Sequence, residues 1–124
     1  MATPIPLSPD HLRDLVLLYL AVGYGDAGTL ATAEHDAIVE LALQWAPPQR
    51  RDATRAIVDT ASVASRSGLV GDVDAIARAL LPALPPPHRQ RALSDLARVA
   101  RADGGLSVSE ASLIGRVRSV WGRA

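Results

Sequence analysis

The chain has 124 residues, a formal net charge of zero at neutral pH and no cysteine. This length fits one domain whose single core is large enough to fold without disulfides or a structural metal. The missing cysteines exclude a disulfide scaffold, thiolate zinc sites, iron–sulfur clusters and thiol chemistry. Because the net charge is zero, the chain has no global attraction to nucleic acid or to an anionic membrane.

The predicted domain organisation is a short tail, residues 1–7, followed by one domain, residues 8–124. The tail does not resemble a secretory signal, so we expect a cytoplasmic protein. The longest apolar run, residues 15–22, is far shorter than the ~20 residues that cross a bilayer, and no membrane insertion is expected. The three prolines at 85–87 form a stiff link that is too short to separate two cores.

Apolar residues recur at helical spacing along the chain, and no stretch shows the alternation of a half-buried strand. We therefore expect an all-α bundle of about six helices. The first is predicted from Pro9 to Tyr24 with Ser8 as its N-cap, and it is apolar on almost all sides, which places it at the centre of the domain. The second is predicted at residues 32–46, where Pro47 and Pro48 end it.

Four further helices are expected after short breaks. The third is predicted at residues 49–65, with an inward face made of Ala53, Ala56, Ile57, Thr60 and Ala64. The fourth is predicted to follow an N-cap at Asp72 and to stop at Pro82. The fifth and sixth are predicted at residues 88–102 and 108–121.

An internal repeat relates the two ends of the chain. Shifting the sequence by 76 residues aligns positions 17–45 with 93–121 without a gap, and eight of these 29 positions are identical. The identical pairs include Glu34 with Glu110, and Trp45 with Trp121, which are the only two tryptophans. Each copy is predicted to be a helical hairpin with a glycine-containing turn, and both tryptophans are expected in related core positions.

The turn of the second copy has a local explanation for each residue. Gly104 or Gly105 suits the left-handed conformation that ends a helix, and Ser107 with Glu110 forms a capping box. In the first copy Ala31 replaces the capping serine, yet Glu34 is retained. This hints at a use for the glutamate other than capping.

These loops resemble those of the tellurite-resistance TerB-like family, in which Asp-Gly-x-hydrophobic is followed by Glu at the start of the next helix. Asp103-Gly104-Gly105-Leu106 with Glu110 fits the pattern, whereas Ala27 separates Asp26 from Gly28 in the first loop. The resemblance spans about residues 8–122. It implies a non-catalytic helical domain of bacterial stress-response systems that works beside other proteins, with acidic loop residues suspected of holding a cation. Membrane-anchored DnaJ-type co-chaperones carry a similar domain at their N-terminus, so the fold does not fix the pathway.

Two interpretations of the acidic residues remain open. Asp26, Glu34, Asp103 and Glu110 are hard oxygen ligands suited to Ca²⁺ or Mg²⁺. One Asp and one Glu per loop do not complete the shell of a calcium ion, so loop carbonyls and water would have to contribute. The other interpretation is that the carboxylates cap helices and favour their positive ends, and it is the one that we favour.

The charge is divided unevenly, with minus five in residues 1–48 and plus five in the rest. Arg91, Arg98 and Arg101 lie three or seven positions apart on the fifth predicted helix, in a stripe that faces an acidic partner, phosphates or only water. The opposite charges of the two regions also allow a homo-oligomer. Nucleic-acid binding has weak support because the chain has no lysine and few aromatic residues.

The sequence contains little that points to an enzyme. It has no helical pair of histidines four residues apart, no phosphate loop with lysine and no nucleophile elbow. The function we expect is therefore a TerB-like interaction domain that binds an unidentified protein partner and carries no cofactor other than Ca²⁺ or Mg²⁺. The alternative is an adaptor for nucleic acid or an acidic partner that uses the arginine stripe.

Overall fold

The computed structural model describes residues 7–24, 32–66, 73–102 and 108–122. In these ranges it contains six α-helices, two short 3₁₀ turns and no strand, which confirms the predicted all-α class. The elements are α1 (Pro9–Tyr24), α2 (Thr32–Leu43), η1 (Pro48–Arg50), α3 (Arg51–Arg66), α4 (Val73–Leu80), η2 (Leu81–Ala83), α5 (Pro86–Arg101) and α6 (Val108–Gly122). No helix among the described residues is both long and apolar enough to cross a bilayer.

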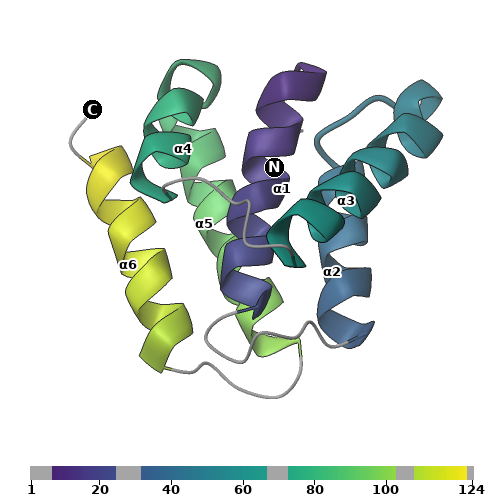
Figure 1. The fold of residues 1–124 in the computed structure, drawn as a ribbon. Coiled ribbons are helices and arrows are strands. Elements are labelled where there is room, and N and C mark those ends of the chain that lie inside the picture. Colours follow the sequence, from purple (N-terminus) through teal and green to yellow (C-terminus); the bar gives the residue numbers. More distant parts are fainter. Residues whose placement is uncertain (1–6, 25–31, 67–72, 103–107, 123–124) are drawn as a thin grey trace.

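Helix α1 runs through the middle of the bundle, with α2 and α3 on one side and α4 and α6 on the other (Figure 1). It contacts each of the other five helices, as the apolar residues around its whole circumference predict. Its buried apolar residues are Leu12, Leu15, Val16, Leu17, Leu18, Tyr19, Leu20 and Val22. Burial of each leucine contributes about 1.5–3 kcal/mol, so α1 supplies much of the driving force for folding.

The start of α1 is fixed by a confirmed N-cap and by one residue of the expected tail. The backbone N–H of His11 donates to Ser8 Oγ at 3.2 Å. Leu7 is buried, and its N–H donates to the carbonyl of Trp45 at 3.0 Å. Leu7, which the sequence analysis assigns to the tail, therefore packs against the core of the domain.

Helix α2 ends three residues earlier than predicted. Gln44 and Trp45 donate their N–H groups to carbonyls three residues back, at 3.2 and 3.0 Å, so the last turn is tightened before Ala46. A residue that precedes proline is disfavoured in the α conformation, and Ala46 precedes Pro47. The helix therefore closes before the diproline.

The predicted inward face of α3 is wrong. Ala53, Ala56 and Thr60 are exposed, Ile57 is only half-buried and Ala64 lies outside the side chains described. The buried residues are instead Thr54, Val58, Ala61 and Ser62. Thr54, Val58 and Ala61 each lie one residue past a predicted position. Thr54 and Ser62 are polar, so a pattern of apolar residues misses them. Their small size still lets α3 approach α1 and α2, which it contacts.

Helix α5 begins two residues earlier than predicted, inside the triple proline. Pro86 and Pro87 form its first turn, and the carbonyl of Pro85 accepts the N–H groups of His88 and Arg89 at 2.8 and 3.0 Å. Proline fits this place because the first N–H groups of a helix have no intrahelical acceptor. Buried residues before and after the prolines belong to one hydrophobic cluster.

The repeat is visible in the folded chain. Helices α2 and α6 begin 76 residues apart, at Thr32 and Val108. The six identical pairs that the structure describes agree in burial: Leu17 and Leu93, Leu20 and Leu96, Glu34 and Glu110, Ile38 and Ile114, and Trp45 and Trp121 are all buried, while Ala21 and Ala97 are both half-buried. Both indoles lie in the core, as predicted. Gly28, Leu30, Gly104 and Leu106 lie outside the described residues.

Candidate functional site

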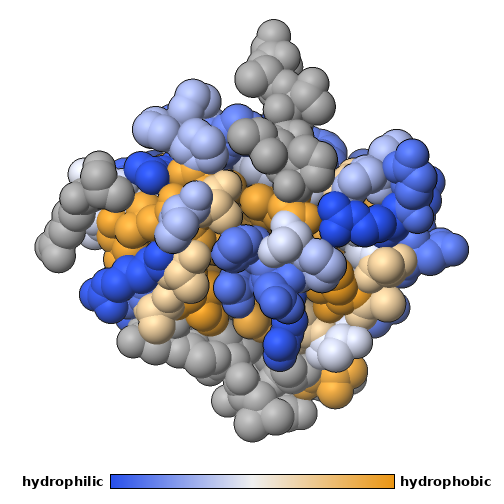
Figure 2. Space-filling model, turned by 90° about the horizontal axis from the view of Figure 1, so that it is seen from above, coloured by the Kyte–Doolittle hydropathy of each residue, from blue (hydrophilic) through white to orange (hydrophobic). Residues whose placement is uncertain are grey.

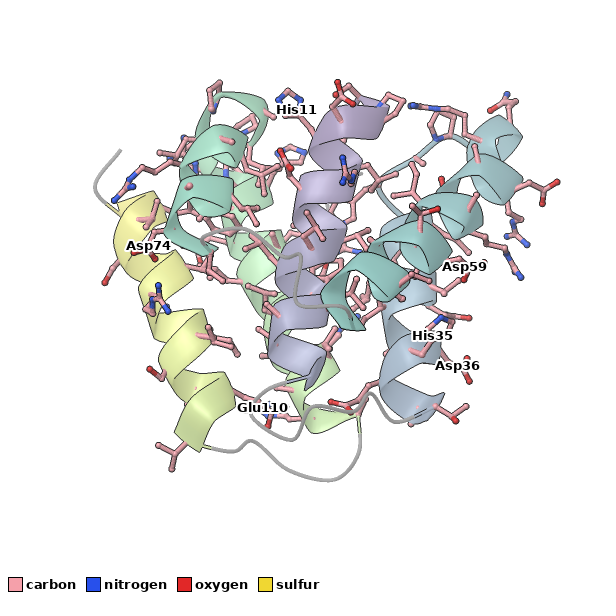
Figure 3. The ribbon with its side chains drawn as sticks, in the orientation of Figure 1. His11, His35, Asp36, Asp59, Asp74 and Glu110 are labelled. Carbon is pink, nitrogen blue, oxygen red and sulfur yellow. The ribbon has the colours of Figure 1, made fainter. Side chains whose placement is uncertain are left out.

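The repeated hairpins place two glutamates at comparable positions. Glu34 lies in the first turn of α2 and Glu110 in the first turn of α6, and their exposed fractions are only 3% and 7%. The starts of both helices lie at the same end of the bundle, and Glu110 is seen there in Figure 3. Both side chains take part in polar interactions. A glutamate is rarely buried unless its charge is compensated. The polar interactions of both side chains are therefore what allows their burial.

The aspartates predicted to accompany these glutamates, Asp26 and Asp103, lie outside the described residues. The same holds for the predicted caps at Asp72 and Ser107 and for the turn glycines. Among the residues that are described, no group of three or more His, Asp or Glu side chains is arranged to hold a metal ion. Of the four predicted ligands, only Glu34 and Glu110 belong to these residues.

The core contains a polar cluster that the sequence interpretation missed. Asp95, on α5, has an exposed fraction of 1%, and its Oδ2 accepts hydrogen bonds from the Tyr19 hydroxyl at 2.8 Å and from Trp45 Nε1 at 3.1 Å. Trp45 Nε1 also lies 3.0 Å from the Tyr19 oxygen. The three side chains join α1, α5 and the end of the first hairpin through buried hydrogen bonds.

One sequence signal points to the burial of Asp95. It lies on the same helical face as Ala92 and Val99, which are both buried, and Arg91 precedes it by four residues. An acid on an apolar stripe with an arginine one turn away indicates a charge that is buried and paired. Nothing in the sequence identifies Tyr19 and Trp45 as the other partners, because they lie 76 and 50 residues away.

Arg91 completes the polar cluster at its outer edge. Its Nε lies 3.4 Å from Asp95 Oδ1, and its guanidinium also donates to the side-chain oxygen of Gln44. Burial raises the pKa of the Tyr19 hydroxyl well above its ordinary value of 10.0, and the neighbouring charge of Asp95 raises it further. Tyr19 is therefore a neutral donor at physiological pH, and Arg91 balances the carboxylate.

The three arginines predicted as one stripe have different surroundings. Arg91 is half-buried and engaged with Asp95, whereas Arg98 and Arg101 are exposed. Arg98 and Arg101 line one surface depression together with Ser94. Arg98 also borders a second depression, which contains Asp36 and Glu40 of α2. The structure therefore keeps two of the three arginines together on an exposed surface.

The three histidines have different surroundings. His11 Nδ1 is 3.1 Å from Ser8 Oγ at the start of α1, and His35 lies between Asp36 and Asp59, 3.8 Å from an oxygen of each (Figure 3). The ring of His88 packs against Trp45 with a centroid distance of 6.1 Å. Viewed from the end of the bundle where α1 begins, hydrophilic and hydrophobic side chains of the described residues are intermixed on the visible face (Figure 2).

Comparison with known proteins identifies the family. No curated protein and no solved structure matches the chain. A family model described as "Tellurite resistance protein TerB" matches residues 15–122, which include both hairpins, the buried Glu34 and Glu110 and the polar cluster around Asp95. The family is all-α, as the six helices are, and the chain belongs to the TerB family.

Proposed function

We propose that this protein is a non-enzymatic interaction domain of a bacterial stress response of the tellurite-resistance type, and that it acts in the cytoplasm beside a protein partner. The observation that carries the proposal is the match to the TerB family model, which extends over both hairpins. The buried polar cluster is consistent with a non-catalytic role, because Asp95 is held by three donors inside the core. A carboxylate held in this way stabilises the bundle and is shielded from substrate.

Deletion of the gene in its host, followed by growth in graded tellurite, tests the stress-response role. We expect the deletion strain to be inhibited at lower tellurite than the parent, and wild-type protein supplied from a plasmid to restore growth. A destabilised core variant such as Asp95→Ala should fail to complement because too little folded protein accumulates. Equal growth of parent and deletion strain at every tellurite concentration would contradict this assignment.

We further propose that a divalent cation, Ca²⁺ or Mg²⁺, binds at the loop between α5 and α6 through Asp103 and Glu110, with Asp26 and Glu34 as the related pair of the first hairpin. Carboxylates are the oxygen ligands that both ions prefer. The burial of Glu34 and Glu110 at comparable helix starts supports this proposal, since it brings both carboxylates out of bulk water. With so few acids per loop, binding is expected in the millimolar range.

Amide NMR during Ca²⁺ and Mg²⁺ titration tests the cation. We expect shifts concentrated around residues 103–110, and their loss in the double variant Asp103→Asn, Glu110→Gln. The matched control is Glu40→Gln with Asp52→Asn, which removes the same charge from exposed positions on α2 and α3. An unchanged spectrum at several millimolar cation, or an equal response of both double variants, would leave helix capping as the role of these acids.

The exposed pair Arg98 and Arg101 favours a second candidate, an adaptor that binds an acidic partner or nucleic acid on α5. Such binding weakens steeply as salt increases. A gel shift or pull-down that is lost at high salt and in the variant Arg98→Gln, Arg101→Gln would support it. Sedimentation at low and high salt tests the related proposal that the acidic and basic regions of two copies associate.

A further inference from the structure

A cleft with several polar side chains lies between α4 and α6. Its volume is about 310 Å³, and its lining includes Asp74, Arg78, Ser112, Gly115, Arg116 and Ser119. Asp74 and Arg78 lie one turn apart on α4, and the other four lie at spacings of three, four and seven on α6, so each set shares one helix face. The two helices contact each other, and Figure 3 shows Asp74 where they meet.

The two arginines of the cleft differ in their interactions with the rest of the protein. Arg116 Nε lies 3.4 Å from Asp74 Oδ1, and this ion pair joins α6 to α4. Arg78 is exposed, and it makes no ion pair or side-chain hydrogen bond with the segments of the chain that the structure describes. The ionisable lining therefore carries a net charge of plus one, with one arginine oriented by a carboxylate and the other facing solvent.

Gly115 gives an independent indication. It lies in the interior of α6, where glycine costs about 1 kcal/mol relative to alanine. A Cβ atom built at this position would meet no atom within 4 Å. Packing inside the protein therefore does not require the glycine. Because glycine has no side chain, open space remains beside Arg116. Glycine is the usual residue where a ligand approaches the backbone closely.

We propose that this cleft binds a small ligand through a phosphate group. Guanidinium groups bind phosphate oxygens through paired, charge-assisted hydrogen bonds. Two arginines with the hydroxyls of Ser112 and Ser119 offer more donors than the two oxygens of a carboxylate accept, whereas a phosphate group presents three or more. The volume is at the small end of ligand sites, which suits a phosphate with a small substituent. The site goes beyond the proposed interaction role and does not depend on it.

Titration of the protein with methyl phosphate and inorganic phosphate, at constant ionic strength and followed by amide NMR, tests the site. We expect saturable shifts at residues of α4 and α6, and a weaker response to acetate. Arg78→Gln should weaken phosphate binding at least tenfold, since it removes charge-assisted hydrogen bonds to the phosphate; tenfold corresponds to about 1.4 kcal/mol. Arg55→Gln removes the same group from an exposed position on α3 and should bind like the wild type.

Gly115→Leu places a side chain in the cleft without changing its charge, and it should abolish binding while the protein stays folded. The proposal would be overturned by no saturable response below ~20 mM phosphate, by equal weakening in Arg78→Gln and Arg55→Gln, or by wild-type binding in Gly115→Leu. Acetate binding as tight as phosphate binding would reject phosphate as the recognised group. Because Arg78 has no partner among the described residues, its replacement tests binding with the fold unaltered.

Discussion

Tyr19 and Asp95 are equivalent positions of the internal repeat, 76 residues apart, and they form a hydrogen bond of 2.8 Å with each other in the core. Counterparts that touch must lie where the two hairpins meet. The two equivalent tryptophans differ in their hydrogen bonds. Trp45 donates to both residues of the pair, whereas its counterpart Trp121 donates to the carbonyl of Ala77 at 2.8 Å. The repeat is therefore symmetric in its helices and asymmetric in its polar core.

A double-mutant cycle on this pair should reveal strong coupling. Tyr19→Phe leaves the shape of the ring intact but removes one donor from a buried carboxylate, so we expect a loss of about 1.5–3 kcal/mol in unfolding free energy. Asp95→Asn should also destabilise. Urea denaturation of the single and double variants should show that the two losses do not add. Simple additivity would mean that the hydrogen bond contributes nothing.

High pH should destabilise the protein through Tyr19. Its pKa is raised in the folded state by burial and by Asp95, so the folded chain holds this proton more tightly than the unfolded chain. The contribution is complete below the ordinary pKa of 10.0, and it is lost as the pH rises above that value toward the folded pKa. Urea titrations at pH 9 to 11 should show a steeper loss in the wild type than in Tyr19→Phe. Parallel losses would exclude Tyr19 as the cause.

Asp14→Asn should stabilise the protein slightly at neutral pH. Burial raises the pKa of Asp14 above 3.8, although His11 and Arg13 oppose the shift. The folded state thus disfavours the carboxylate, and its stability falls as the pH rises from the unfolded pKa through the folded one. Because the group is largely solvated, we expect a gain below about 0.5 kcal/mol that disappears under pH 3.8. Asp10→Asn, an exposed change one turn earlier, should show no such gain.

Gly115→Ala should raise the unfolding free energy by about 0.5–1 kcal/mol, because alanine is the better helix former and its Cβ meets no neighbour. Thermal unfolding followed by circular dichroism measures this. Gly122→Ala is the control, since Gly122 is the last residue of α6 and also has open space around it. Its gain should be smaller. Destabilisation by Gly115→Ala would contradict the open space around this position.

The two tryptophans should respond differently to phenylalanine. Truncation of either one to alanine should cost about 3 kcal/mol or more, because both are buried. Trp45→Phe should cost more than Trp121→Phe, since it removes a donor to the charged Asp95 whereas the other change removes a donor to a neutral carbonyl. Chemical denaturation of all four variants decides this. Equal costs for the two phenylalanine variants would contradict the asymmetry.

The helices could be predicted from the amino-acid sequence because helical periodicity, the Ser8 cap and the prolines act over a few residues. The repeat and the burial of both tryptophans were also predictable, since equal offsets in one chain give comparable environments. The inward face of α3 was not predictable. Thr54 and Ser62 are polar, and they are buried because other helices pack against them. The pairing of Asp95 with Tyr19 and Trp45, and the meeting of Arg78 and Arg116 in one cleft, likewise depend on how distant helices pack.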